Sequence, residues 1–211
     1  MSTAAVPDRF PSRGTAAELE TWLTERGVSV DQWGTGGYKS VARLADEVTK
    51  GESRLEVKDG VVSRLVEVLT LAVWPPEDPG LLLYEVRQIL PDGRIRERNV
   101  VLSEKLVVGE FWQHAVQRAI EEELGPAING WLEVDLDESS YSRTETVEDA
   151  RSYPGVRCTY IVHRARCMVG GLPAETFDTV ESRPEEGGTL TTVWEWRRVQ
   201  HLNGAGPVQI P

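Results

Sequence analysis

Acidic residues and one arginine recur at helical spacing between Glu110 and Gly125. The segment reads E-F-W-Q-H-A-V-Q-R-A-I-E-E-E-L-G. Hydrolysis of a diphosphate calls for a hard cation such as Mg²⁺, which neutralises phosphate oxygens and orients a water molecule. Because residues three and four apart share a helix face, this segment can present several carboxylates on one surface. The pattern therefore favours metal-assisted phosphate chemistry.

The same segment resembles the signature of the Nudix superfamily, G-x5-E-x7-R-E-U-x-E-E-x-G-U, in which U is a bulky apolar residue. Aligned on the arginine, the positions that agree are Glu110, Arg118, Ile120, Glu122, Glu123 and Gly125. Three positions differ, with Glu104 at the opening glycine, Ala119 at the glutamate after the arginine and Pro126 at the last apolar position. In family members the residue that corresponds to Ala119 is commonly a metal ligand, so this difference bears most directly on activity.

The resemblance implies a role for each matching residue. Glu122 and Glu123 would hold Mg²⁺ or Mn²⁺, and Glu110 would assist catalysis. Arg118 would orient the carboxylates through charge-assisted hydrogen bonds. Because position 119 lacks a carboxylate, the general base must come from elsewhere, and the candidates are Glu121, His114 and a carboxylate of residues 137–149.

Two functions stay open. The first is a divergent Nudix hydrolase that acts with a divalent cation on a nucleoside diphosphate-linked small molecule. The second is a Nudix-fold protein that has lost hydrolysis and binds a ligand or performs different chemistry in the same pocket, with the cation weakly bound or absent. Glutamates at a helix C-terminus oppose the helix dipole at about 0.3–1 kcal/mol each. We favour the enzyme, because a site that no longer catalyses has no evident reason to retain glutamates that destabilise the helix end.

Arg94, Arg96 and Arg98 precede the acidic segment and form a candidate substrate-binding group. Their positive charges could hold a substrate phosphate against a cation on the acidic helix. They also alternate along an expected strand, so they could instead line its solvated face. The sequence leaves both interpretations open.

A second phosphate-binding motif is incomplete. Trp33–Ser40 reads W-G-T-G-G-Y-K-S, and its glycines and Lys-Ser pair imitate a phosphate-cradling loop before a helix. A P-loop has glycine immediately before the lysine, and here that residue is Tyr38. We therefore expect a glycine-rich hinge that leads into a helix, while an anion at the start of that helix stays open.

Composition and charge limit the partners. The chain has 211 residues, 40% of them hydrophobic, which is enough for one large domain or a domain with an appendage. Its net charge of −11 disfavours nucleic acids and anionic membranes. No apolar run approaches the roughly 20 residues that cross a membrane. We therefore expect a small-molecule substrate or ligand, no nucleic acid and no membrane.

The cysteines and the start of the chain indicate a cytoplasmic protein. Cys158 and Cys167 lie in one expected strand at an odd separation, which points them to opposite faces and argues against a disulfide. Unpaired cysteines fit a reducing compartment. The first residues also lack the apolar region of a secretory signal.

Local patterns predict the elements that position these residues. A capping box at Thr15 and Glu18 begins a helix over 16–26, and a second helix covers 40–50. Asp59-Gly60 and Asp92-Gly93 are expected hairpin turns. The polar segment 137–154 is expected to be a long surface loop. Strands are expected at 55–57, 61–73, 81–90, 94–102, 131–136, 156–169 and 189–199.

These elements predict an α+β chain with four parts. They are a disordered leader (1–14), an N-terminal helical appendage (15–54), a Nudix-like domain (55–202) and a flexible tail (203–211). The resemblance implies an α/β/α sandwich with a mixed sheet for the main domain. The N-terminal helices could mediate a homodimer. Neither the substrate nor the oligomeric state follows from the sequence.

Overall fold

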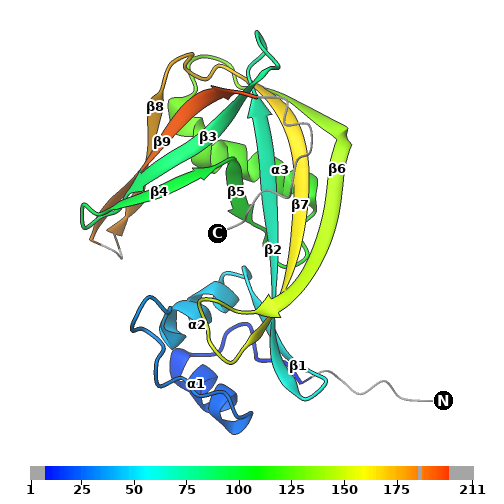
Figure 1. Cartoon of the computed structure of the whole chain (residues 1–211), viewed down its shortest axis with the longest axis vertical. Coiled ribbons are helices and arrows are strands. Elements are labelled where there is room, and N and C mark those ends of the chain that lie inside the picture. The colour runs from blue at the N-terminus through cyan, green and yellow to red at the C-terminus, as the bar shows by residue number, and fades with distance from the viewer. Residues whose placement is uncertain (1–7, 185–186, 200–211) are drawn as a thin grey trace, which may run out of the picture. The chain divides into compact units, whose positions relative to one another are not determined.

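The computed structural model of the chain describes residues 8–184 and 187–199 (Figure 1). Residues 1–7 of the expected leader, residues 200–202 of the expected main domain and the whole expected tail lie outside the described residues. The chain divides into two compact units. The first unit contains Met1–Val68, Lys105–Trp112 and Arg143–His163, and the second contains Leu69–Glu104, Gln113–Ser142 and Arg164–Pro211.

Two short helices belong to the first unit. Helix α1 (Ala16–Glu25) begins at Thr15, whose hydroxyl accepts the backbone N–H of Glu18 at 3.3 Å. In return, the Glu18 carboxylate accepts the backbone N–H of Thr15 at 2.8 Å. Helix α2 (Val41–Thr49) begins at Ser40, whose hydroxyl caps its first turn. Both predicted helices and the predicted capping box are therefore confirmed.

Residues 8–14 differ from the expected disordered leader. Phe10 is 6% exposed, and its backbone N–H donates to the carbonyl oxygen of Leu55 at 3.1 Å. The ring fits because Gly14 has no side chain, since a Cβ there would lie 2.2 Å from Cζ of the ring. Burial of this aromatic side chain holds the segment in an ordered position.

The first unit is larger than the expected appendage of residues 15–54. Helices α1 and α2 pack against strands β1 (Arg54–Lys58) and β2 (Val61–Trp74) and against a segment near residue 153. A short amphipathic helix needs such a partner surface to bury its apolar face. The buried residues of this core include Leu19, Leu23, Leu44, Leu55, Val62, Val66, Tyr153, Val156 and Cys158.

The strands form two β-sheets. Besides β1 and β2, the strands are β3 (Leu81–Ile89), β4 (Ile95–Val100), β5 (Leu102–Lys105), β6 (Glu133–Asp149), β7 (Arg157–Gly170), β8 (Phe177–Arg183) and β9 (Gly188–Arg198). One sheet has the order β1-β2-β7-β6, with β5 paired to β2. The other has the order β4-β3-β9-β8, and its neighbouring strands are antiparallel.

Both predicted Asp-Gly turns join neighbouring strands. Asp59 and Gly60 connect β1 to β2, and both have positive φ angles, of 52° and 77°. A two-residue hairpin turn needs this backbone geometry, which explains the residue choice. Gly93 likewise has a positive φ of 82° between β3 and β4.

The acidic segment forms a helix with an irregular end. Helix α3 (Trp112–Ala119) continues into a π-helical turn, η1 (Ile120–Leu124), and a 3₁₀ turn, η2 (Gly125–Ala127). A π-helical turn holds more residues than an α-helical turn, so side chains beyond Ala119 are shifted around the helix. Apolar residues recur at helical spacing in this segment and predict a buried stripe of Phe111, Trp112, Ala115, Val116, Ala119, Ile120 and Leu124. The last five are buried, whereas Phe111 is 71% exposed.

The α+β fold class is confirmed, but one predicted loop is a strand. β6 runs to Asp149 in place of the surface loop predicted for residues 137–154. Its start overlaps the strand predicted at 131–136, but beyond Leu136 its residues are mostly polar and lack the apolar alternation by which a strand is recognised. β8 was not predicted either. Within the described residues, no helix is long and apolar enough to cross a membrane.

Candidate functional site

Arg118, in the last turn of α3, binds two carboxylates of the second unit. Its Nη1 atom lies 3.2 Å from Oε1 of Glu104 and 3.1 Å from Oε2 of Glu122. Glu104 comes from β5, and Glu122 lies four residues after the arginine. Glu104 stands where the Nudix signature has glycine, so it adds a carboxylate that the signature does not contain.

Glu123 lies in a strongly negative environment. Burial, together with the charges of Glu104, Glu181 and Glu85, raises its pKa to about 7, against an opposing effect of Arg183. A carboxyl group in such surroundings keeps its proton close to neutral pH unless positive charge is added nearby. Shifts of this kind are typical of functional sites, although structural ion pairs also produce them.

Two of the acidic neighbours of Glu123 are held by arginines. Glu85 of β3 is buried and accepts a hydrogen bond from Nε of Arg98 at 3.1 Å. Glu181 of β8 pairs with Nη2 of Arg183 at 2.6 Å. Arg183 reduces the repulsion at Glu123 without removing it.

A pocket of about 250 Å³ opens beside Glu122 and Glu123. Its hydroxyl groups come from β8 and β9, and that of Thr179 accepts the indole N–H of Trp194 at 2.9 Å. Carboxylates and hydroxyls suit a hydrated cation or a polar ligand. The other lining residues are Pro126, Thr179, Val180, Glu181, Ser182 and Thr192.

Ala119, at the position where the Nudix signature has glutamate, is buried. Its side chain is 0% exposed, whereas Glu122 is exposed. The π-helical turn that starts at Ile120 separates the two positions around the helix. A carboxylate at position 119 would therefore have to enter the apolar interior, at a large desolvation cost.

The other predicted catalytic residues have different surroundings. Glu110 belongs to the first unit, where its carboxylate accepts the backbone N–H of Val107 at 3.0 Å. Glu121 accepts a hydrogen bond from Nε2 of Gln117 at 2.9 Å, and His114 is exposed on α3. Neither Glu121 nor His114 lines the pocket beside Glu123.

The three predicted substrate-binding arginines each contact a polar side chain. Arg94 pairs at 2.6 Å with the aspartate of the preceding Asp-Gly turn. Arg96 donates to Oε1 of Gln88 at 3.3 Å, and both arginines are exposed. Arg98 instead binds Glu85, one of the carboxylates that act on Glu123. Of the three, Arg98 is thus the one connected to the candidate site.

The residues present have the right chemistry for a hard cation but are not assembled around one. Within residues 8–184 and 187–199, no three His, Cys, Asp or Glu side chains are grouped so that they could hold a metal ion. The carboxylates of Glu104, Glu122 and Glu123 are the donors that Mg²⁺ and Mn²⁺ prefer. Arg118 contacts two of the three. A cation would therefore compete with Arg118 for these oxygens.

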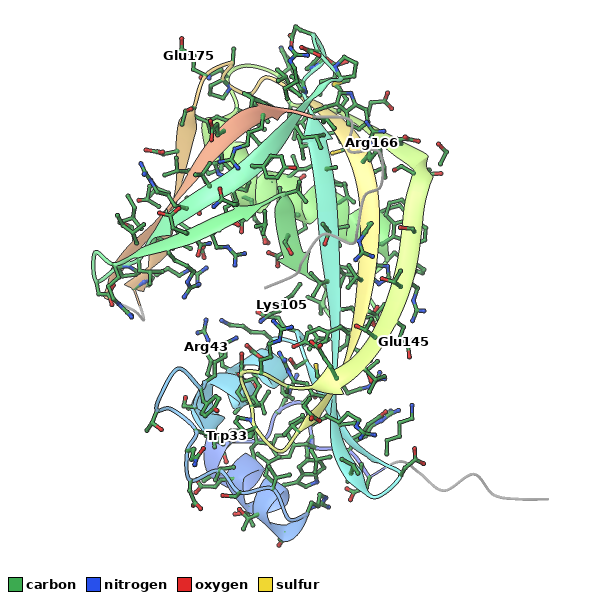
Figure 2. The ribbon with its side chains drawn as sticks, in the orientation of Figure 1. Trp33, Arg43, Lys105, Glu145, Arg166 and Glu175 are labelled. Atoms are coloured by element: carbon green, nitrogen blue, oxygen red, sulfur yellow. The ribbon has the colours of Figure 1, made fainter. Side chains whose placement is uncertain are left out.

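A second charged cluster lies in the first unit around Glu47, which is 2% exposed. Its carboxylate lies 2.6 Å from Arg64, 2.7 Å from Lys39 and 3.2 Å from Lys105, which Figure 2 labels. Burial acts to raise the pKa of Glu47, but the three cations lower it to about 2. Lys39 is the lysine of the glycine-rich segment Trp33–Ser40, and its ammonium group neutralises the Glu47 carboxylate.

His163 and Glu67 form another pair in the first unit. The distance from Nε2 of His163 to Oε2 of Glu67 is 3.0 Å, and His163 is 7% exposed. The two residues lie on β7 and β2, 96 positions apart in the chain. No local sequence pattern signals such a pair.

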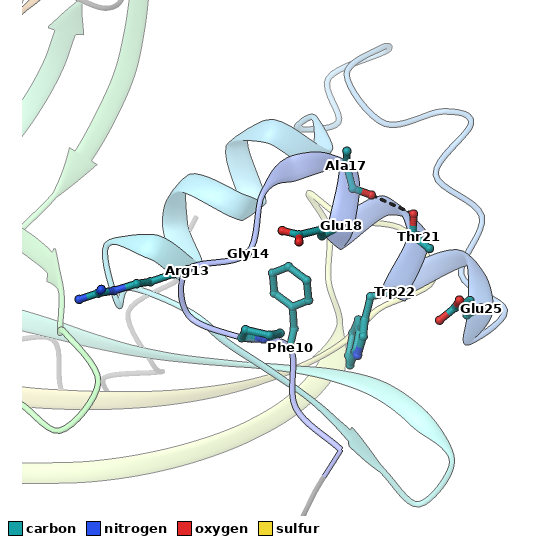
Figure 3. Close-up of a pocket in the computed structure, with 9 residues that line it drawn as sticks. Phe10, Arg13, Gly14, Ala17, Glu18, Thr21, Trp22 and Glu25 are labelled. Carbon is teal, nitrogen blue, oxygen red and sulfur yellow. Dashed lines mark hydrogen bonds between the residues drawn. The ribbon is translucent and has the colours of Figure 1, made fainter.

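A larger pocket, of about 570 Å³, lies in the first unit on α1 (Figure 3). The rings of Phe10 and Trp22 form its apolar wall. Of its charged residues, Glu18 is already used in the capping box of α1. The pocket therefore offers an apolar surface without a grouped acid and base.

Comparison of the chain with models of known protein families, with curated proteins and with solved structures finds no match. The residues around Glu123 combine carboxylates, arginines and a pocket in one unit, and they form the candidate functional site.

Proposed function

We propose that this chain is a divergent Nudix-type hydrolase that acts, with a divalent cation, on a diphosphate-containing small molecule such as a nucleoside diphosphate linked to another group. The position of Glu104 carries the proposal. Where the signature has glycine, this chain places a carboxylate that shares Arg118 with Glu122, at 3.2 and 3.1 Å. Glu104 thereby restores the negative charge that Ala119 removes from the signature.

Glu104, Glu122 and Glu123 would hold Mg²⁺ or Mn²⁺. When bound, the cation would neutralise diphosphate oxygens and make a bound water more acidic. Burial and then repulsion from neighbouring carboxylates raise the pKa of Glu123, and the repulsion supports this assignment because a cation would relieve it. Arg118 orients two of the carboxylates through charge-assisted hydrogen bonds.

We expect the α+β chain to belong to the Nudix sandwich class and to be located in the cytoplasm. We expect no nucleic-acid or membrane partner, since a net charge of −11 opposes binding to polyanions. Homodimer formation would use the N-terminal helices, whose groove beside Phe10 and Trp22 is apolar.

A Nudix-fold protein that binds a ligand without hydrolysing it is the second candidate. Two observations favour it: the described residues hold no preassembled metal group, and Ala119 is fully buried. In this case the pocket beside Glu122 and Glu123 would receive the ligand, while Arg118 would keep both of its carboxylate partners.

Turnover of a panel of nucleoside diphosphate-linked compounds, with and without Mg²⁺ or Mn²⁺, tests the two candidates. The hydrolase should show cation-dependent phosphate release that falls at least about tenfold in Glu123→Gln, as expected for a disturbed metal site. Glu97→Gln is the matched control, because it removes an exposed carboxylate on β4. It should leave turnover unchanged.

The opposite outcomes are equally informative. Absence of both turnover and cation binding, measured by calorimetry, would exclude the hydrolase. Saturable binding of one compound of the panel without hydrolysis would support the second candidate, and Glu123→Gln should then weaken that binding.

A further inference from the structure

Strand β6 ends its sheet. Among the described strands its neighbour is β7, so one edge of β6 presents backbone N–H and C=O groups to the outside. Its first five residues, Glu133–Asp137, belong to the second unit. The Asp137 carboxylate then accepts the backbone N–H and the hydroxyl of Ser139, at 3.1 and 2.6 Å. These local hydrogen bonds occupy the backbone N–H of Ser139, within a strand that continues to Asp149.

Every second side chain of this stretch belongs to an apolar groove. Leu132 and Val134 are 39% and 42% exposed, and Trp131 immediately before them is 93% exposed. A group of exposed large apolar side chains is typical of an interaction surface. The groove has a volume of about 300 Å³ and is lined by Leu132, Val134, Leu136, Gln113, Val116, Gln117, Ile120 and Glu121.

The intervening side chains are acidic. Glu133, Asp135 and Asp137 alternate with the groove residues and, by the two-residue period of a strand, point to the opposite face. Residues 131–138 contain no lysine or arginine. A second copy of this edge, paired antiparallel, would place acidic residues against acidic residues, which is destabilising. The charge therefore favours a basic occupant over a second copy of the chain.

We propose that the Glu133–Asp137 edge of β6 is a docking site for an extended, basic peptide segment of a partner protein. The segment adds to the sheet as a further strand, with main-chain hydrogen bonds along the edge. Its apolar side chains enter the groove beside Val134, and its alternate lysine or arginine side chains lie opposite Glu133 and Asp135. The site holds about five residues of the peptide, because the groove residues of β6 end at Leu136 and the Asp137 side chain occupies the Ser139 N–H.

Fluorescence anisotropy on the full chain tests this assignment. The probe is a fluorescein-labelled peptide of four Lys-Val repeats, whose alternation matches the edge. It should bind saturably, and a Glu-Val peptide of equal length should not bind. A Lys-Val peptide that is N-methylated at every backbone amide keeps the charge and the apolar groups but has no backbone N–H donors. It should bind at least about tenfold more weakly, because strand addition depends on main-chain hydrogen bonds.

Two variants distinguish peptide binding at this edge from nonspecific attraction of a basic peptide to an acidic protein. Asp135→Lys should weaken Lys-Val binding at least about fivefold, since it opposes like charges across the strand pair. Asp178→Lys is the matched control, with the same charge change at an exposed position of β8, the end strand of the other sheet. It should change the affinity less than about twofold.

Three results would overturn the proposal. One is equal loss of affinity in Asp135→Lys and Asp178→Lys, with both variants folded by circular dichroism. Another is equal affinity for the methylated and unmethylated peptides. The third is a dimer in sedimentation that Asp135→Lys alters, because the occupant would then be a second copy of the chain.

Discussion

Nη1 of Arg118 lies 3.2 Å from Oε1 of Glu104, a residue 14 positions earlier in the chain. This contact connects the acidic helix to β5 and brings a carboxylate from outside the helix to its acidic end. In sequence alone, Glu104 is a mismatch to the Nudix signature. In the structure it is the residue through which the proposed active site can be tested most directly.

Glu104→Gln should lower cation-dependent turnover by about 10–100-fold, because it removes one proposed oxygen donor and the charged partner of Arg118. Glu104→Gly, which introduces the residue of the signature, should have a similar effect. Steady-state kcat and KM at several Mg²⁺ concentrations measure the change. If both variants are folded and keep the parent turnover, Glu104 serves only to hold Arg118.

Glu123→Gln should stabilise the protein at pH 8 but not at pH 4. The folded-state pKa of Glu123, about 7, lies above its ordinary value of 4.5, so the folded state binds this proton more tightly than the unfolded state. Stability is therefore lost as the pH rises from about 4.5 to about 7, and glutamine avoids this loss. Thermal unfolding across this pH range measures the difference.

The control for this prediction is Glu121→Gln, which removes an exposed carboxylate of the same turn. It should show no comparable pH-dependent gain. Added Mg²⁺ should also raise the melting temperature of the parent more than that of Glu123→Gln. A stability difference that stays constant between pH 4 and pH 8 would contradict the assigned environment of Glu123.

Glu47→Gln should destabilise the protein by about 3–5 kcal/mol, because it leaves the buried guanidinium of Arg64 without its charged partner. The lowered pKa of Glu47, about 2 against an ordinary 4.5, gives the pH dependence. Its stabilising effect is present above about pH 4.5 and is lost as the pH falls toward 2. Urea unfolding of parent and variant measures both effects.

Asp46→Asn provides the comparison on the same helix. Asp46 pairs with Arg43 and Lys50 at the surface, at 3.8 and 3.0 Å, so its loss should cost less than about 1 kcal/mol. Similar losses in the Asp46 and Glu47 variants would show that the buried cluster adds nothing beyond a surface ion pair.

Ala119→Glu should destabilise the protein by more than about 2 kcal/mol and should not raise turnover. Position 119 is fully buried, so the new carboxylate would be desolvated without a partner. Ala42→Glu is the control, since Ala42 is exposed on α2. A folded Ala119→Glu protein with faster turnover would show that the helix can present this position to the site.

Local features of the fold could be predicted because their causes lie within a few residues. The capping box at Thr15 and the hairpin turn at Asp59-Gly60 each follow from hydrogen bonds or φ preferences of neighbouring residues. The pairing of Arg118 with Glu122 follows in the same way from their four-residue spacing on a helix. Only the start of β6 could be predicted, as the strand 131–136, because apolar and polar residues stop alternating after Leu136.

The sequence by itself determined the acidic helix, its apolar stripe and one arginine–glutamate pair of the candidate site. Only the tertiary structure decided which carboxylates surround Glu123, since Glu85, Glu104 and Glu181 come from three separate strands. The burial of Ala119 follows from its place in the apolar stripe, but spacing rules do not anticipate the π-helical turn that begins at Ile120. Contacts of this kind depend on strand order and register, and those are set by burial of the whole chain, which no short segment encodes.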